Sequence, residues 1–204
     1  MTGIKNLMFD LGGVIMDIER MNAVCALKDL GMSDVDELLG DYGQKGPFLG
    51  LERGDIDIDE FHRQLRPYLP AGVTDSQIDS AFIKFLVGIP VERLRALEQL
   101  KRKYNIYLLS NTNPLMWNSY ILDEFRKDGH DIGYYFDDEV ASFQVHAYKP
   151  DAEIFHIAEK KFGIKPEETV FFDDSASNCE AAERLGFHTV HVIPGTEFTD
   201  YIHD

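Results

Sequence analysis

The stretch FDLGGVIMD, Phe9–Asp17, decides the fold of this 204-residue sequence. An apolar run ends there in one carboxylate, Asp10, and Gly12 and Gly13 follow at a point where the chain must turn. A short and almost continuously apolar segment is typical of a strand that is buried on both faces of a parallel sheet. The stretch therefore predicts a buried strand, Ile4–Asp10, that ends in an acidic side chain.

Other segments of the same kind follow along the chain, and helical patterns lie between them. The clear strand candidates are Asn105–Asn111, Thr169–Asp174 and His188–Ile193, and a weaker one is Tyr134–Ser142. Apolar residues at helical spacing precede the second strand from Pro90 onward, and they recur in residues 151–163 and 177–187. Helices that alternate with buried strands predict an α/β fold, a Rossmann-like parallel sheet flanked by helices.

The segment from residue 17 to residue 89 has a different pattern. It contains four helix-like stretches separated by Gly, Pro and Asp-rich breaks, and no convincing strand. It begins directly after the first strand, and a helix then leads from it to the second strand. We therefore predict an inserted α-helical cap over residues 17–89, and a catalytic core formed by residues 1–16 and 90–204.

Polar side chains stand where the predicted strands end. Asp10 ends the first strand, Ser110 and Asn111 end the second, and Asp173 and Asp174 follow the third. In parallel α/β sheets ligands bind beyond the carboxyl ends of the strands. Three carboxylates at one edge would repel one another without a cation between them, and their hard oxygen ligands suit Mg²⁺.

The same edge also offers groups for an anion. Lys149, followed by Pro150, precedes the helix before Thr169–Asp174, and its charge together with the Ser110 hydroxyl suits a phosphoryl group. Asp10 is the candidate nucleophile, because carboxylates form aspartyl-phosphate intermediates. Each of these features is common by itself, and it is their shared position that predicts phosphoryl transfer.

The composition limits the partners. Acidic residues outnumber basic ones 36 to 20, which gives a formal net charge of −16. Such a chain repels nucleic acid and anionic membrane surfaces, so neither is an expected partner. Two cysteines are too few for a disulfide framework, and no signal peptide or membrane-spanning stretch is evident. We expect a cytoplasmic protein, as a monomer or a homodimer.

Four motifs in order make the chain resemble the haloacid dehalogenase superfamily, whose members are mostly Mg²⁺-dependent phosphatases. The motifs are LMFDLGGVI, LLSNTN, YKP and FFDDSASN, and they match the branch that contains α-D-glucose-1-phosphate phosphatases. The resemblance implies a phosphomonoester hydrolase that acts on a small phosphorylated metabolite, with a sugar phosphate such as glucose 1-phosphate favoured. It makes Asp10 the nucleophile, assigns phosphate to Ser110, Asn111 and Lys149, and assigns Mg²⁺ to Asp10, the Gly12 carbonyl, Asp173 and Asp174. Asn178 would orient the metal site.

Two positions depart from the family pattern. Most phosphatases of this superfamily have a second Asp two residues after the nucleophile, which protonates the leaving oxygen, whereas this chain has Gly12. The resembled branch also has glycine there and is still counted as phosphatase. His146 stands where the family usually has glycine, and either a structural role or a contact with substrate is open.

Specificity is expected to come from the cap. Within Tyr42–Gly54, the side chains of Lys45, Glu52 and Arg53 are candidates for binding hydroxyls, and Phe48 is a candidate for stacking on a sugar or flat ring. Two other functions stay open at this point. One is a 2-haloacid dehalogenase, against which the pair Asp173 and Asp174 argues, and the other is a catalytically weak protein that binds a phosphorylated metabolite.

Overall fold

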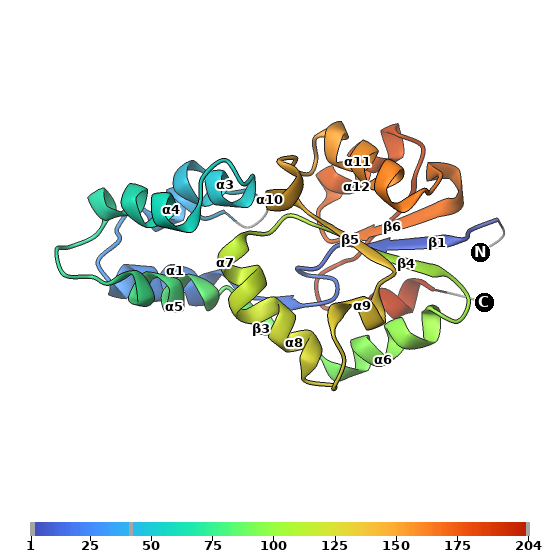
Figure 1. The fold of residues 1–204 in the computed structure, drawn as a ribbon, viewed down its shortest axis with the longest axis horizontal. Coiled ribbons are helices and arrows are strands. Elements are labelled where there is room, and N and C mark those ends of the chain that lie inside the picture. Colours follow the sequence, from blue (N-terminus) through green and yellow to red (C-terminus); the bar gives the residue numbers. More distant parts are fainter. Residues whose placement is uncertain (1–2, 41–42, 203–204) are drawn as a thin grey trace.

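A computed structural model describes residues 3–40 and 43–202. The first two and last two residues of the predicted core, and Tyr42 of the predicted specificity stretch, lie outside these ranges. The core holds a five-stranded parallel sheet in the order β5-β4-β1-β6-β7, which confirms the predicted α/β fold (Figure 1). The strands are β1 (Asn6–Phe9), β4 (Asn105–Ser110), β5 (Asp138–Ala141), β6 (Thr169–Asp173) and β7 (His188–His191).

Successive residues of the strands enter two separate hydrophobic clusters. Leu7 and Phe9 of β1 belong to one cluster, and Met8 belongs to the other. The inner strands β4 and β6 alternate in the same way. Because side chains of a strand point alternately to its two faces, both faces of the sheet are buried, as the continuous apolar runs predict.

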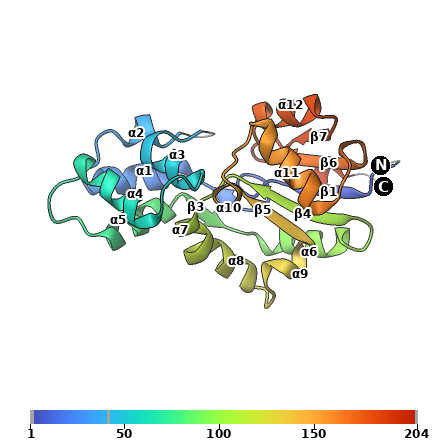
Figure 2. The ribbon, with the colours of Figure 1, turned by 45° about the horizontal axis from the view of Figure 1, so that its top comes forward.

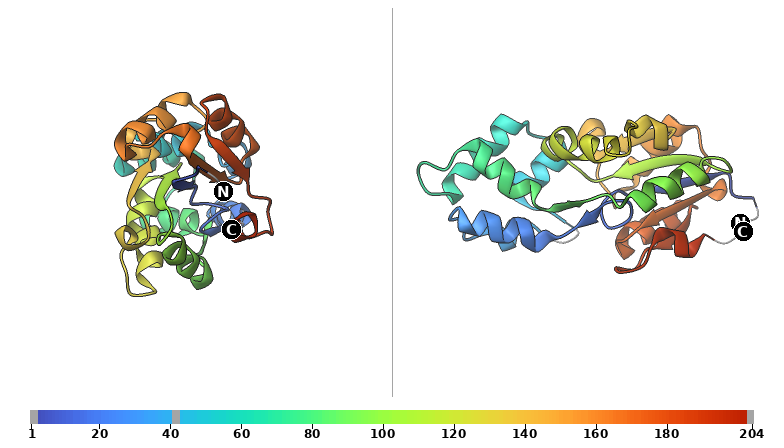
Figure 3. Two further views of the ribbon diagram at one scale, coloured as in Figure 1. Left: turned by 90° about the vertical axis from the view of Figure 1, so that its right-hand side faces the viewer. Right: turned by 90° about the horizontal axis from the view of Figure 1, so that it is seen from below.

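Helices cover both faces (Figures 2 and 3). One face packs against α6 (Val91–Leu100), α8 (Leu122–Arg126) and α9 (Ile132–Tyr135), and the other packs against α11 (Ala152–Phe162) and α12 (Ala176–Arg184). The predicted strand Tyr134–Ser142 is only partly a strand, because α9 occupies its start and α10 (Ser142–Val145) begins at its end. The remaining short elements of the core are α7 (Pro114–Met116), the π-helical turn η2 (Trp117–Ile121), η3 (Pro166–Glu168) and η4 (Phe198–Tyr201).

A second lobe, made of helices in the described residues, lies beyond one end of the sheet (Figure 1). They are α1 (Arg20–Asp29), α2 (Val35–Leu38), α3 (Gly46–Glu52), α4 (Ile58–Leu65) and α5 (Asp75–Ile83), with the 3₁₀ turn η1 (Arg66–Tyr68) after α4. Phe48, Phe61 and Phe82 form the aromatic centre of this lobe, with ring centroids 4.9–5.7 Å apart. The placement of these helices agrees with an inserted cap, and its boundaries at residues 17 and 89 stay a prediction.

The expectation that residues 17–89 contain no strand is wrong. The two chain segments that join the lobes pair as a short antiparallel ribbon of β2 (Asp17–Ile18) and β3 (Leu86–Gly88). The side chain of Tyr120 donates a hydrogen bond to the carbonyl of Val87, which ties the ribbon to the core. Strands of two and three residues are too short to show the alternation by which a strand is recognised. In the described ranges, no helix is long and apolar enough to span a bilayer.

Candidate active site

The central strand of the sheet brings the predicted nucleophile between two other strand ends. Asp10 directly follows β1, whose neighbours are β4, ending in Ser110, and β6, ending in Asp173. The backbone N–H of Asp10 donates to the carbonyl of Phe172 at 2.8 Å, which extends the pairing with β6 by one residue. Parallel pairing in register thus places these functional groups at one edge.

Lys149 is the positive centre of the site. Its Nζ lies 2.9 Å from Asp10 Oδ1 and 2.7 Å from Asp173 Oδ2, and its side chain is fully buried. Burial by itself would lower the pKa of this ammonium group, but the two carboxylates outweigh it and the pKa is raised. Lys149 is therefore charged at neutral pH.

Asp173 is the most enclosed carboxylate of the site. Besides Lys149, it accepts hydrogen bonds from the N–H of Ser175 at 2.8 Å and from Asn178 Nδ2 at 3.0 and 3.2 Å. The side chain of Asn178 thus orients an acid next to the predicted metal position. Both Asp173 oxygens accept hydrogen bonds, and of the three acids at the strand ends Asp10 and Asp174 are the two that line the cavity.

The three acids fit a divalent cation. One oxygen from each of Asp10, Asp173 and Asp174 lies within 4.8 Å of the others. Burial is the main cause that raises the pKa of Asp10 to about 7 and that of Asp174 to about 6, and repulsion by neighbouring carboxylates adds to it. A cation among these oxygens would favour the ionised forms, and hard oxygen donors are the ligands that Mg²⁺ prefers.

A glycine gives Asp174 its room. Gly13 has a φ of +72°, and a Cβ at this position would overlap the Asp174 carboxylate. The backbone therefore approaches the acid more closely than any other residue type would permit. This observation explains the second glycine of the FDLGGVI stretch.

Asn111 holds the lysine loop in place. Its Oδ1 accepts from the backbone N–H of Lys149 and its Nδ2 donates to the Lys149 carbonyl, both at 2.9 Å. The neighbouring Ser110 is almost fully buried and lines the same cavity. The segment that follows β4 thus brings a hydroxyl to the cavity and fixes the position of Lys149.

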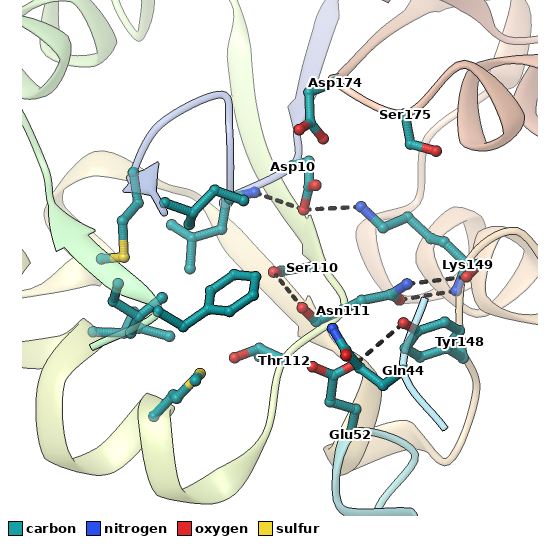
Figure 4. A pocket seen from close by; sticks show the side chains of 18 of the residues that line it. Asp10, Gln44, Glu52, Ser110, Asn111, Thr112, Tyr148, Lys149, Asp174 and Ser175 are labelled. Carbon is teal, nitrogen blue, oxygen red and sulfur yellow. Dashed lines mark hydrogen bonds and ion pairs between the residues drawn. The ribbon is translucent and has the colours of Figure 1, made fainter. Parts of the chain in front are cut away.

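The cavity lies between the strand ends and the cap (Figure 4). At its base are Asp10, Ser110, Lys149 and Asp174, and one wall is formed by the polar side chains of Gln44, Glu52, Thr112 and Tyr148. The remaining lining is mostly apolar: Met16, Ile18, Leu39, Phe82, Phe85, Leu86, Met116 and Ile121. A ligand held here meets an anion site at one end and a mixed polar and apolar surface at the other.

Of the four predicted cap residues, Glu52 is the one that lines this cavity. Phe48 is fully buried in the aromatic centre of the cap and therefore cannot stack on a substrate ring, which corrects that expectation. Lys45 is exposed at the start of α3 and is not part of the lining. Arg53 lies over the ring of Tyr148 and pairs with Asp151 at 3.2 Å, so it joins the cap to the core.

His146 has a structural explanation. It ends α10 in the left-handed conformation, with a φ of 53°, is exposed and does not line the cavity. Glycine is the residue that favours this conformation, so the geometry accounts for a position at which glycine is usual. This placement favours the structural alternative over a contact with substrate.

Sequence reasoning missed Gln44, Thr112 and Tyr148. Tyr148 is next to Lys149 in the YKP motif, and Thr112 follows Asn111 in LLSNTN. Their places in these motifs are therefore a signal from which both could have been predicted to lie near the site. Gln44 belongs to the predicted specificity stretch, but only the folded cap brings it to the cavity. The Tyr148 hydroxyl donates a hydrogen bond to Glu52 Oε2 at 3.1 Å. This pairing could not be predicted from the sequence, because the two residues are 96 positions apart.

Comparison with known proteins places the chain in a family. Residues 4–186 match the family model of the haloacid dehalogenase-like hydrolases. This protein is a haloacid dehalogenase-like hydrolase. A D-ribitol-5-phosphate phosphatase of Bacteroides thetaiotaomicron is 37% identical over 195 residues, which is 96% of this chain and 95% of that protein.

Solved structures of family members are similar over their whole length. A haloacid dehalogenase family enzyme of Bacteroides thetaiotaomicron, in complex with magnesium and inorganic phosphate, has a TM-score of 0.91 at 36% identity, and the match covers 98% of this chain and all of that one. A predicted family hydrolase of Porphyromonas gingivalis has a TM-score of 0.90 at 36% identity and covers 98% of this chain and 96% of that one. These similarities, together with the cluster of three acids, confirm the predictions of a phosphatase of this family and of Mg²⁺ as its cofactor.

Proposed function

We propose that this protein hydrolyses the phosphomonoester of a small sugar or sugar alcohol, with Mg²⁺ as cofactor, through an aspartyl-phosphate on Asp10. The proposal rests on the contacts that hold the Asp10 carboxylate. Its Oδ1 accepts from the Leu11 N–H at 2.7 Å and from Lys149, so the carboxylate is held in one orientation at the base of the cavity. A nucleophile held in this way needs little reorganisation before it attacks.

The other residues of the site have complementary tasks. Lys149 and the Ser110 hydroxyl provide the charge and the donor that a phosphoryl group requires, and Asn111 keeps Lys149 in position. Asp10, the Gly12 carbonyl and Asp174 are the groups we assign to the metal. Bound there, Mg²⁺ supplies positive charge against the phosphoryl oxygens and against the crowded carboxylates.

An acyclic sugar-alcohol phosphate is our first candidate substrate, ahead of glucose 1-phosphate. Glucose 1-phosphate was favoured by core motifs, whose residues contact phosphate and metal and therefore say little about the rest of the substrate. The relative of 37% identity is a D-ribitol-5-phosphate phosphatase, which favours a pentitol phosphate. The cavity has polar side chains on one wall and mostly apolar ones elsewhere, which suits a substrate whose carbon chain has both hydroxyl groups and C–H groups.

The test is phosphate release from D-ribitol 5-phosphate, glucose 1-phosphate and other sugar phosphates, with Mg²⁺ and with chelator. We expect the pentitol phosphate to have the highest kcat/KM, and chelator to abolish turnover. Asp10→Asn should lower kcat by on the order of 10³-fold or more, since the nucleophile is lost. Thermal unfolding of this variant serves as the control for folding.

Undiminished phosphate release by Asp10→Asn would contradict the proposal. Chloride release from a 2-haloacid in the presence of chelator would support the dehalogenase alternative instead. Binding of phosphorylated sugars without turnover of any substrate would support the non-catalytic alternative.

A further inference from the structure

The site lacks an evident proton donor for the leaving oxygen, because Gly12 has no side chain. Among the described residues, five titratable groups line the cavity: Asp10, Glu52, Tyr148, Lys149 and Asp174. An acid that protonates the leaving group must contact the substrate in this cavity. One of these five groups is therefore the donor.

Four of the five have another task. Asp10 is the nucleophile, and Asp174 is assigned to the metal. Lys149 is held in two ion pairs with carboxylates, and its raised pKa makes it a poor acid. The hydroxyl of Tyr148 donates its proton to Glu52, and burial raises its pKa further. Glu52 is the group that remains.

Glu52 is held firmly at the contact between cap and core. It is the last residue of α3, and its backbone carbonyl accepts a hydrogen bond from Ser142 Oγ of the core at 2.6 Å. Its side chain is almost fully buried, with Oε2 bound to Tyr148, while Oε1 has no hydrogen bond within the described ranges. Figure 4 shows the side chain of Glu52 entering the cavity from the cap side, with its hydrogen bond to Tyr148.

The surroundings keep a proton on Glu52 at neutral pH. Burial raises the pKa of its carboxyl to about 8; the hydrogen bond from Tyr148 lowers it, and the negative charge of Asp10 raises it. The charged and titratable groups that face it from the packed elements are Tyr148 and Asp10, and Arg53 and Lys149 are next to these. A carboxyl that keeps its proton, lines the cavity and has one oxygen without a hydrogen bond within the described ranges is arranged as a general acid.

We propose that Glu52 is the catalytic acid and base of this enzyme and takes the role that Gly12 cannot fill; this rests on the proposed function. In the first step Asp10 forms a bond to phosphorus, the bond from phosphorus to the leaving oxygen breaks, and Glu52 gives its proton to that oxygen. In the second step the Glu52 carboxylate takes a proton from water, whose oxygen bonds to phosphorus as the Asp10 bond breaks. Alcohol and phosphate leave, and Glu52 is protonated again.

The experiment compares two leaving groups in wild type and Glu52→Gln. The probes are the best sugar or sugar-alcohol phosphate from the panel above, and p-nitrophenyl phosphate, whose weakly basic leaving group needs no proton. Because the second step needs the Glu52 carboxylate with either substrate, the two esters are compared in the first step, by the rate of alcohol or p-nitrophenol release in a single turnover. We expect Glu52→Gln to lower this rate by about 10²–10⁴-fold with the alkyl ester and to leave it within a few-fold with the aryl ester. Turnover of the alkyl ester by wild type should fall as pH rises through about 8, and this decrease should be absent in the variant.

A second variant tests the proposal without altering the acid. Tyr148→Phe removes the hydrogen bond that stabilises ionised Glu52, so the decrease at alkaline pH should move to higher pH. An equal loss of the single-turnover rate with both substrates in Glu52→Gln, a rise in KM alone, or an unchanged pH of the alkaline decrease in Tyr148→Phe would each overturn the proposal. Asp10→Asn should lose activity on both substrates whether or not Glu52 is the acid. A failure of the role assigned to Glu52 is therefore distinct from a failure of the proposed function.

Discussion

At the scale of single residues, two backbone features explain positions that side-chain chemistry alone does not. Gly13 lets the chain approach Asp174, and His146 ends a helix in a conformation that favours glycine. Neither is recognisable from one sequence, because nothing in the residue letters states the backbone angle. The functional side chains, by contrast, were predicted from their places after strands, since parallel strands bring their ends together.

Replacement of Gly13 by alanine tests the close approach to Asp174. The new Cβ would overlap the Asp174 carboxylate, and a left-handed alanine adds strain of about 1–2 kcal/mol. We expect weaker Mg²⁺ binding, measured as a higher Mg²⁺ concentration for half-maximal activity, together with a lower melting temperature.

Gly163→Ala is the matched control. Gly163 ends α11 with a similar φ of +65°, but a Cβ there meets no atom within 4 Å. This variant should show the strain without the change in Mg²⁺ requirement. An identical Mg²⁺ requirement in both variants would refute the role assigned to Gly13.

At the scale of elements, the long strands and helices were predictable and the short connections were not. β4, with five buried residues in six, is recognisable from hydrophobicity alone, whereas β2 and β3 exist because two passing segments pair. The start of α3 lies in the stretch Tyr42–Gly54, where Phe48 is a candidate from sequence for stacking on a substrate ring. In the structure Pro47 occupies the first turn of a helix, where proline is tolerated, and Phe48 faces the cap interior.

The aromatic centre of the cap predicts a stability effect for Phe48→Ala. Removal of a fully buried phenylalanine ring should lower the free energy of unfolding by about 3–5 kcal/mol. Tyr68→Ala, at an exposed aromatic residue of the same lobe, is the control and should change it by less than about 0.5 kcal/mol. Chemical denaturation measures both. A Phe48→Ala variant of unchanged stability but raised KM would restore the expectation that this ring contacts substrate.

At the scale of the whole molecule, the buried acids link stability to pH and to metal. The pKa values of Asp174, Asp10 and Glu52 are raised to about 6, 7 and 8, so the folded state binds more protons than the unfolded state. Stability must then decrease as pH rises through this window. The lowered pKa values of Asp36, Glu168 and Glu197 act in the opposite direction, but below this window.

We therefore expect the metal-free protein to melt at progressively lower temperature between pH 5 and pH 8. Mg²⁺ should raise the melting temperature more at pH 8 than at pH 5, because it favours the ionised forms of Asp10 and Asp174. Thermal unfolding in chelator and in Mg²⁺, at both pH values, checks this. A Mg²⁺ effect of the same size at both values would contradict the assignment of these two acids.

The contact between α3 and α10 has a consequence for how the enzyme can cycle. Ser142 has a single hydroxyl proton, yet the carbonyl of Glu52 at 2.6 Å and that of Thr112 at 2.9 Å both lie within its reach. If the lobes part, the hydroxyl can rotate from the first carbonyl to the second, so no buried donor is left without an acceptor. For this hydroxyl, parting of the lobes exchanges one acceptor for another, so the cost of opening falls on the hydrogen bond between Tyr148 and Glu52 and on the ion pair between Arg53 and Asp151.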